Sequence, residues 1–81
     1  NEMTADERRE MISNMVESLA NRLASQGGTS DEWAKLIKAL SVLGNTDRAK
    51  KIWAEASNIY KNSPADLNVI NNIANEIGIS R

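Results

Sequence analysis

The side chains that most often carry catalytic chemistry are missing from this sequence or have simpler explanations. Its 81 residues include neither Cys nor His, which excludes thiol nucleophiles, imidazole acid and base catalysis, the usual zinc sites and histidine ligation of haem. Asp, Glu, Lys and Ser are present, but helix capping or a polar helix face explains their spacings. We therefore expect a binding module and not an enzyme, with no metal and no cofactor.

Two methionines are the remaining candidates for ligation. Met11 and Met15 are four residues apart and would share one face of a helix, where thioethers can form a soft ligand site or an adaptable binding face. The same spacing also places them on an apolar stripe. Because no His or Cys accompanies them, packing in the core is the favoured interpretation.

Composition and charge narrow the class of protein. Hydrophobic residues make up 41% and charged residues 26% of the chain, as in ordinary globular domains, which argues against disorder and against a membrane protein. No apolar run approaches the roughly 20 residues that cross a bilayer. The chain starts at Asn1 and not at Met, so we expect a piece of a longer protein, whose signal or anchor can lie elsewhere.

Nucleic-acid binding is disfavoured by the net charge of -1, since phosphate recognition needs a basic stripe. Residues 40–56 are conceivable as a helix-turn-helix. Acidic residues around Arg48, Lys50 and Lys51, however, leave little positive field there. We expect no nucleic-acid partner.

Capping signals predict one all-α domain over residues 1–81, with helices at approximately 5–26, 31–43, 47–60 and 64–77. Thr4 with Glu7 and Thr29 with Glu32 have capping-box spacing. Asn45 or Thr46 is expected to cap the third helix, and Ser63 the fourth, with Pro64 at its first position. Glycines follow three of the helices, at Gly27, Gly44 and Gly78.

Apolar spacing of three and four residues predicts which side of each helix is buried. Short connections imply that successive helices lie antiparallel. Both tryptophans fall on the buried stripes and are interpreted as core. The expected core positions are Met11, Ile12, Met15, Val16, Leu19 and Leu23; Trp33, Leu36, Ile37, Leu40 and Leu43; Ala49, Ile52, Trp53, Ala56 and Ile59; and Leu67, Ile70, Ile73, Ala74 and Ile77.

The spacing within residues 33–56 resembles the tetratricopeptide repeat, and Pro64 follows Ser30 by the 34-residue period of that repeat. The resemblance implies one full repeat flanked by two half repeats, in a right-handed α-α superhelix. Two residues depart from the pattern. Ile37 stands where a small residue is usual, which predicts looser helix packing, and Lys61 stands where Pro is usual.

A closer resemblance covers roughly residues 6–53. Met11-Ile12, Met15-Val16, Leu19-Ala20, Arg22-Leu23, Trp33 and Val42-Leu43-Gly44 are similar to the tetratricopeptide region of bacterial c-type cytochrome biogenesis proteins of the CycH kind. This resemblance implies a periplasmic domain of an inner-membrane-anchored protein. Such a chaperone domain holds apocytochrome c, by its C-terminal helical segment, for the haem-ligation machinery.

In tetratricopeptide stacks the first helix of each repeat lines a concave groove. The resemblance therefore implies a peptide-binding site made by the helices at 31–43 and 64–77, in which lysines meet carboxylates, amides meet backbone groups and valines give apolar contact. The alternatives are a merely solvated face, a generic scaffold for another protein partner, or a domain whose outer helices drive self-association. We expect the domain to be a monomer or to associate weakly with itself. The candidate peptide-binding residues are Lys35, Lys38, Val42, Asn68, Val69 and Asn72.

Overall fold

A computed structural model describes residues 4–79, and this part of the chain consists of helices and turns without a strand. The four helices are α1 (Ala5–Gln26), α2 (Ser30–Val42), α3 (Thr46–Ile59) and α4 (Pro64–Ile77). The expectation of an all-helical chain with four helices is confirmed. α1 and α4 have the ranges expected from their caps, whereas α2 and α3 each begin and end one residue earlier.

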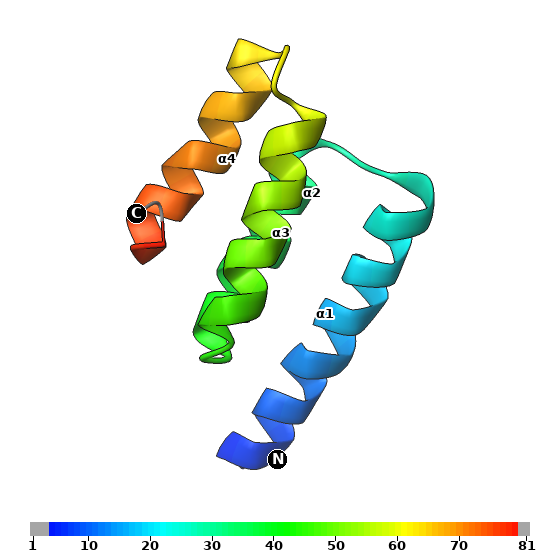
Figure 1. Cartoon of the computed structure of the whole chain (residues 1–81). Coiled ribbons are helices and arrows are strands. Elements are labelled where there is room, and N and C mark those ends of the chain that lie inside the picture. The colour runs from blue at the N-terminus through cyan, green and yellow to red at the C-terminus, as the bar shows by residue number, and fades with distance from the viewer. Residues whose placement is uncertain (1–3, 80–81) are drawn as a thin grey trace.

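The helices α2 and α3 form a central antiparallel hairpin, and α1 and α4 lie on opposite sides of it (Figure 1). α4 packs against both helices of the hairpin, whereas α1 packs mainly along α2. The described chain is therefore elongated, with extents of 46 × 28 × 20 Å. Because α1 has few neighbours, one of its long sides stays open to solvent.

Both threonine capping boxes form as the sequence predicts. The Glu7 amide donates to Thr4 Oγ1 at 3.1 Å, and the Thr4 amide donates back to Glu7 Oε1 at 3.1 Å. The hydrogen bonds from Thr4 hold the pKa of Glu7 below its ordinary value. At α2 the Glu32 amide donates to Thr29 Oγ1 and the Thr29 amide to Glu32 Oε1. Extended backbones at the two threonines, with ψ of 163° and 161°, allow this geometry.

The N-cap positions expected at Asn45 and Ser63 are confirmed, but the side-chain capping bonds expected there do not form. Both residues occupy the N-cap position, but neither side chain accepts a hydrogen bond from its helix. Their ψ angles, 63° and 83°, are far from the extended values at the threonines. Tight turns impose these angles: the Asn45 amide donates to the Leu40 carbonyl across Gly44 (φ +79°), and the Ser63 amide donates to Tyr60. Backbone closure thus overrides side-chain capping at these two starts.

The core lies mainly between α2, α3 and α4. Leu36, Ile37 and Leu40 of α2 are fully buried, and Trp33 is only 2% exposed, so its assignment to the core is confirmed. Alanines on α3 and α4 allow close approach of these helices to α2. The remaining buried apolar residues are Val16, Leu23, Ala49, Ala56, Ile70, Ala74 and Ile79.

Three residues expected in the core are exposed. Met11, Met15 and Ile59 are 55%, 53% and 53% accessible. The apolar stripe of α1 is wider than the single helix that covers it, so only Val16 and Leu23 are fully enclosed there. Ile59 lies in the last turn of α3 on its exposed side, whereas Ala56 in the same turn is buried.

Trp53 is half-buried, so its interpretation as core is right only in part. One side of the indole packs against the core, and its N–H donates to Asn71 Oδ1 at 3.1 Å. A half-buried indole needs such an acceptor. Asn71 therefore links α4 to α3.

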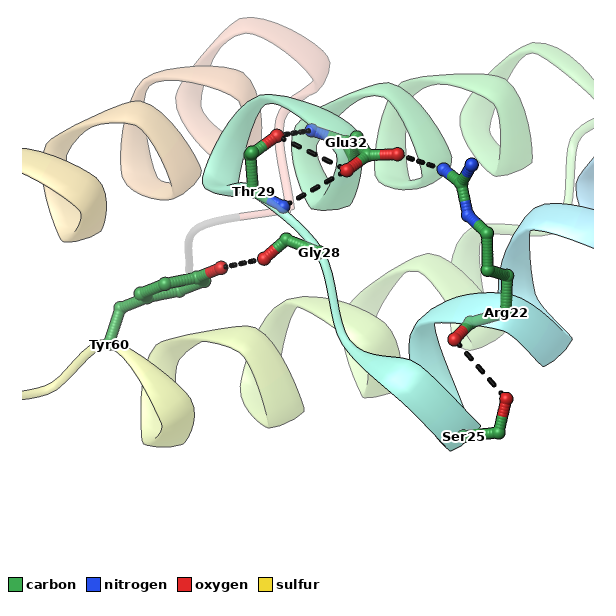
Figure 2. A network of polar contacts seen from close by, with 6 residues as sticks. All are labelled: Arg22, Ser25, Gly28, Thr29, Glu32 and Tyr60. Atoms are coloured by element: carbon green, nitrogen blue, oxygen red, sulfur yellow. Dashed lines mark hydrogen bonds and ion pairs between the residues drawn. The ribbon is translucent and has the colours of Figure 1, made fainter.

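A polar network joins the ends of α1 and α3 to the start of α2 (Figure 2). The Tyr60 hydroxyl donates to the Gly28 carbonyl at 2.7 Å, and Arg22 pairs with Glu32 of the capping box. A side chain at Gly28 would collide with Leu23, since a Cβ would lie 2.5 Å from its Cδ2. The connection between α1 and α2 is therefore fixed on both sides.

Replacing Tyr60 by Phe is expected to lower the free energy of unfolding by about 0.5–1.5 kcal/mol, because the Gly28 carbonyl loses its donor. Burial, followed by the charge of Asp66, raises the pKa of the Tyr60 phenol. The contribution of the protonated Tyr60 phenol to the free energy of unfolding is present below the ordinary tyrosine pKa. It is lost as pH rises through the pKa of the folded state. Tyr60 is the sole tyrosine of the chain, so its absorbance reports the titration directly. An ordinary phenol titration, with equal urea midpoints for both proteins, would contradict this role.

Candidate binding surface

The residues expected to bind a peptide lie on exposed parts of α2 and α4. Lys35, Lys38 and Val42 follow one another at spacings of three and four, so they share one side of α2, and Val42 is 62% exposed. On α4, Asn68 and Asn72 are exposed, whereas Val69 is half-buried. The valine therefore offers less apolar contact than its sequence position suggests.

Two polar contacts connect α2 to α4. Ser30 Oγ donates to Asp66 Oδ1 at 2.9 Å near the start of both helices, and Lys38 Nζ lies 3.5 Å from Glu76 Oε2 near their ends. The two helices therefore run parallel and in register. Both partners of the Lys38–Glu76 pair are about 60% exposed, so the pair adds little stability. It nevertheless places one candidate binding residue against the C-terminal part of α4.

An apolar hollow lies beside these same residues of α2, where α1 packs along that helix. It has a volume of about 260 Å³ and is lined by Ile12 and Met15 of α1 and by Lys35, Lys38, Ala39 and Val42 of α2. Three of the six candidate residues thus line a surface shared with α1. Sequence reasoning missed this surface because it assigned Ile12 and Met15 to the core.

Further hollows extend this surface in both directions along α1. One of about 300 Å³ lies between Arg8, Arg9 and Leu43, and another of about 340 Å³ lies between Leu19, Arg22 and Lys35. We call the whole surface the α1–α2 groove. Arginines lie at the two ends of the groove, and apolar residues lie between them. The sequence does not reveal this arrangement, because it does not show that α1 lacks a second neighbour.

An ion pair connects α1 to α3. Arg48 of α3 makes two hydrogen bonds to the Glu17 carboxylate, one of them 3.0 Å long from Nη2 to Oε1. The hydrogen bond from Arg48 holds the pKa of Glu17 below its ordinary value, and burial opposes this only in part. The same bond raises the pKa of Arg48. The pair therefore adds a surface contact between α1 and α3 to the packing of α1 along α2.

Replacing Glu17 by Gln is expected to weaken the dependence of stability on acid pH. Because the folded pKa of Glu17 is lowered, its contribution is present above the ordinary carboxylate pKa and is lost as pH falls through the folded value. Acid unfolding followed by circular dichroism at low salt measures this change, and Glu55→Gln, at an exposed carboxylate of α3, is the control. Identical acid transitions for the parent and both variants would contradict the pairing, and added salt should shrink the difference.

Within residues 4–79, no group of three or more acidic side chains is placed to hold a metal ion. None of these four helices is long and apolar enough to span a bilayer. The candidate surface itself presents apolar side chains, lysines, arginines and amides.

Comparison with known proteins shows a similarity over nearly the whole chain. The chain is 32% identical over 78 residues to the cytochrome c-type biogenesis protein CycH of Rhizobium meliloti (strain 1021). The match covers 96% of this chain but 20% of CycH, so the chain spans about a fifth of the relative's length. No family model matches the chain, and no solved structure matches it.

Proposed function

We propose that this chain is a protein-binding module of c-type cytochrome maturation, which holds apocytochrome c by its C-terminal helical segment for haem attachment. The observation that carries the proposal is the similarity to CycH over nearly the whole chain. The module acts in the periplasm as part of an inner-membrane-anchored protein, and presents its partner to the haem-ligation machinery. It contributes binding and no catalysis, and it needs no cofactor of its own.

The arrangement of the helices supports a tetratricopeptide-like fold for this role. α4 lies parallel to α2 and starts 34 residues after it, at Pro64 and Ser30. Ala49, Ala56 and Ala74 are fully buried, as small residues at close helix contacts should be. We propose one full repeat, α2 with α3, between the half repeats α1 and α4, with the right-handed twist of such stacks.

The proposed peptide site is the side of α2 and α4 that carries Lys35, Lys38, Val42, Asn68, Val69 and Asn72. Its lysines suit carboxylates, its amides suit the polar ends of a bound helix, and its valines suit apolar side chains. A surface made by two short helices buries less than about 1,200 Å², so we expect micromolar affinity.

A fluorescently labelled peptide from the C-terminal helix of an apocytochrome c tests this function. We expect saturable binding at micromolar concentration, weakened about tenfold (about 1.4 kcal/mol) in Lys38→Glu combined with Asn72→Ala. Lys51→Glu, at an exposed position of α3, is the matched control for charge and should bind as the parent does. If neither the parent nor either variant shows saturable binding, the function is refuted. If all three bind the peptide equally, this site is refuted.

Self-association is a second candidate function, favoured by the exposure of Met11, Met15 and Ile59. Large apolar side chains on outer helices can join neighbouring modules. Sedimentation equilibrium over a wide concentration range separates the two. A monomer throughout would exclude self-association, whereas a concentration-dependent dimer would favour it.

A further inference from the structure

The α1–α2 groove is a continuous surface. The central hollow shares Ile12 and Val42 with the hollow at one end, and Met15 and Lys35 with the hollow at the other. α1 and α2 are antiparallel neighbours along this line (Figure 1). From Arg8 to Arg22 the α1 wall is about 21 Å long, at 1.5 Å per helical residue. This length matches about four turns of a docked helix.

The middle of the groove is apolar and accessible. Met15 and Val42 are 53% and 62% exposed on opposite walls, and Ile12 and Ala39 lie half-buried between them. In the central hollow the lining residues other than the two lysines are all apolar. Covering this surface with an apolar stripe would remove the exposed methionine and valine from water.

The charged residues along the groove are cations, with the exception of Asp6 at one end. This sign is opposite to the net charge of -1 of the whole chain. Arg22 pairs with Glu32 and Lys38 with Glu76, but Arg8, Arg9 and Lys35 have no ion-pair partner within residues 4–79. The two arginines and Lys35 lie on opposite walls and towards opposite ends of the groove, where they can meet acids on both flanks of an occupant.

The walls favour a helical occupant over an extended one. Backbone amides and carbonyls in the middle of α1 and α2 are bonded within their own helices, so they cannot pair with a strand. A helix satisfies its own backbone and presents only side chains to the groove. A third helix lying between two antiparallel ones also follows ordinary ridge-into-groove packing.

We propose that the α1–α2 groove is a docking site for an amphipathic α-helix of about four turns, whose apolar stripe is flanked by Asp or Glu. The site lies on the α1 side of α2, away from Asn68 and Asn72, and it does not depend on the partner being apocytochrome c. It shares Lys35, Lys38 and Val42 with the peptide site proposed above, and goes beyond that site by adding an apolar contact through Met15 and an acidic requirement through Arg9.

The probe is a labelled helical peptide of about 15 residues with leucines at spacings of three and four and glutamates on both flanks. A second peptide has lysines in place of the glutamates. Fluorescence anisotropy should show saturable binding of the acidic peptide. The affinity for the basic peptide should be lower by about tenfold or more. Saturable binding of neither peptide, or equal binding of both, would overturn the proposal.

Met15→Glu places a carboxylate in the apolar middle of the groove, and should weaken the acidic peptide at least about tenfold. Met11→Glu is a closely matched control, because Met11 is on the same helix, is 55% exposed and lies outside the groove. It should bind as the parent does. Equal loss in both variants, or no loss in Met15→Glu, would overturn the site.

Charge reversal at one wall supplies an independent readout. Lys35→Glu should weaken the binding of the acidic peptide and strengthen the binding of the basic one. Lys50→Glu, at an exposed position of α3, should change neither affinity. The unchanged affinity of both peptides for Lys35→Glu would overturn the charge requirement. A dimer in sedimentation that Met15→Glu dissociates would show that a second copy occupies the groove instead.

The two proposals fail separately. Binding of the designed acidic helix without binding of the apocytochrome peptide would refute the cytochrome function and leave the groove intact. Binding of the apocytochrome peptide that depends on Asn72 but not on Met15, with no binding of the designed helix, would refute the groove alone.

Discussion

Trp33→Ala is expected to lower the free energy of unfolding by about 3–5 kcal/mol. The indole is 2% exposed in the first turn of α2 and belongs to the same buried cluster as Leu36 and Leu40. An 81-residue chain has a total stability of about 4–12 kcal/mol. The variant should therefore be close to unfolding at room temperature, which urea denaturation followed by circular dichroism would detect.

The second tryptophan is the internal comparison for this result. Trp53 is half-buried, and its N–H is satisfied by Asn71 at the edge of the core. Trp53→Ala should cost about 1–3 kcal/mol, clearly less than Trp33→Ala. Equal losses, or a larger loss for Trp53, would contradict the position of the core beneath α2.

Ile37→Ala is expected to lower the free energy of unfolding by about 2–5 kcal/mol. In the tetratricopeptide pattern a small residue is usual here, and an intruding isoleucine would hold the helices apart. In this structure Ile37 is completely buried within the core cluster, so shortening it leaves a cavity. Urea denaturation of the variant measures the cost directly.

Val42→Ala controls for the change of an apolar residue to alanine on the same helix. Val42 is 62% exposed, and its replacement should alter stability by less than about 0.5 kcal/mol. A neutral or stabilising Ile37→Ala would mean that the isoleucine strains the contact, and would contradict the packing described for α2.

The sequence predicts the helices well, because they depend on local chemistry. It also predicts the central core well, because that core is built around the apolar side of α2. Thr4 and Thr29 cap their helices as expected, since an extended residue before a helix suffices. Asn45 and Ser63 do not, because turn closure fixes their backbones. Such closure depends on how two helices meet, which local sequence does not determine.

The exposed surface is harder to predict than the core. An apolar stripe shows that a helix has an apolar side but not how much of it a neighbour covers. α1 has α2 on one flank and solvent on the other, so Met15 is 53% exposed although its spacing is that of a core residue. The groove therefore becomes visible only in three dimensions, whereas Lys35, Lys38 and Val42 were identifiable from the repeat register.

The exposed side of α2 is proposed to bind a helical segment of apocytochrome c. Titrating the ¹⁵N-labelled domain with that peptide, and recording amide shifts by NMR, tests it residue by residue. We predict saturable shifts concentrated at Lys35, Lys38 and Val42, with little change at Lys50 on α3. Shifts confined to α3, or none at high micromolar peptide, would contradict the claim.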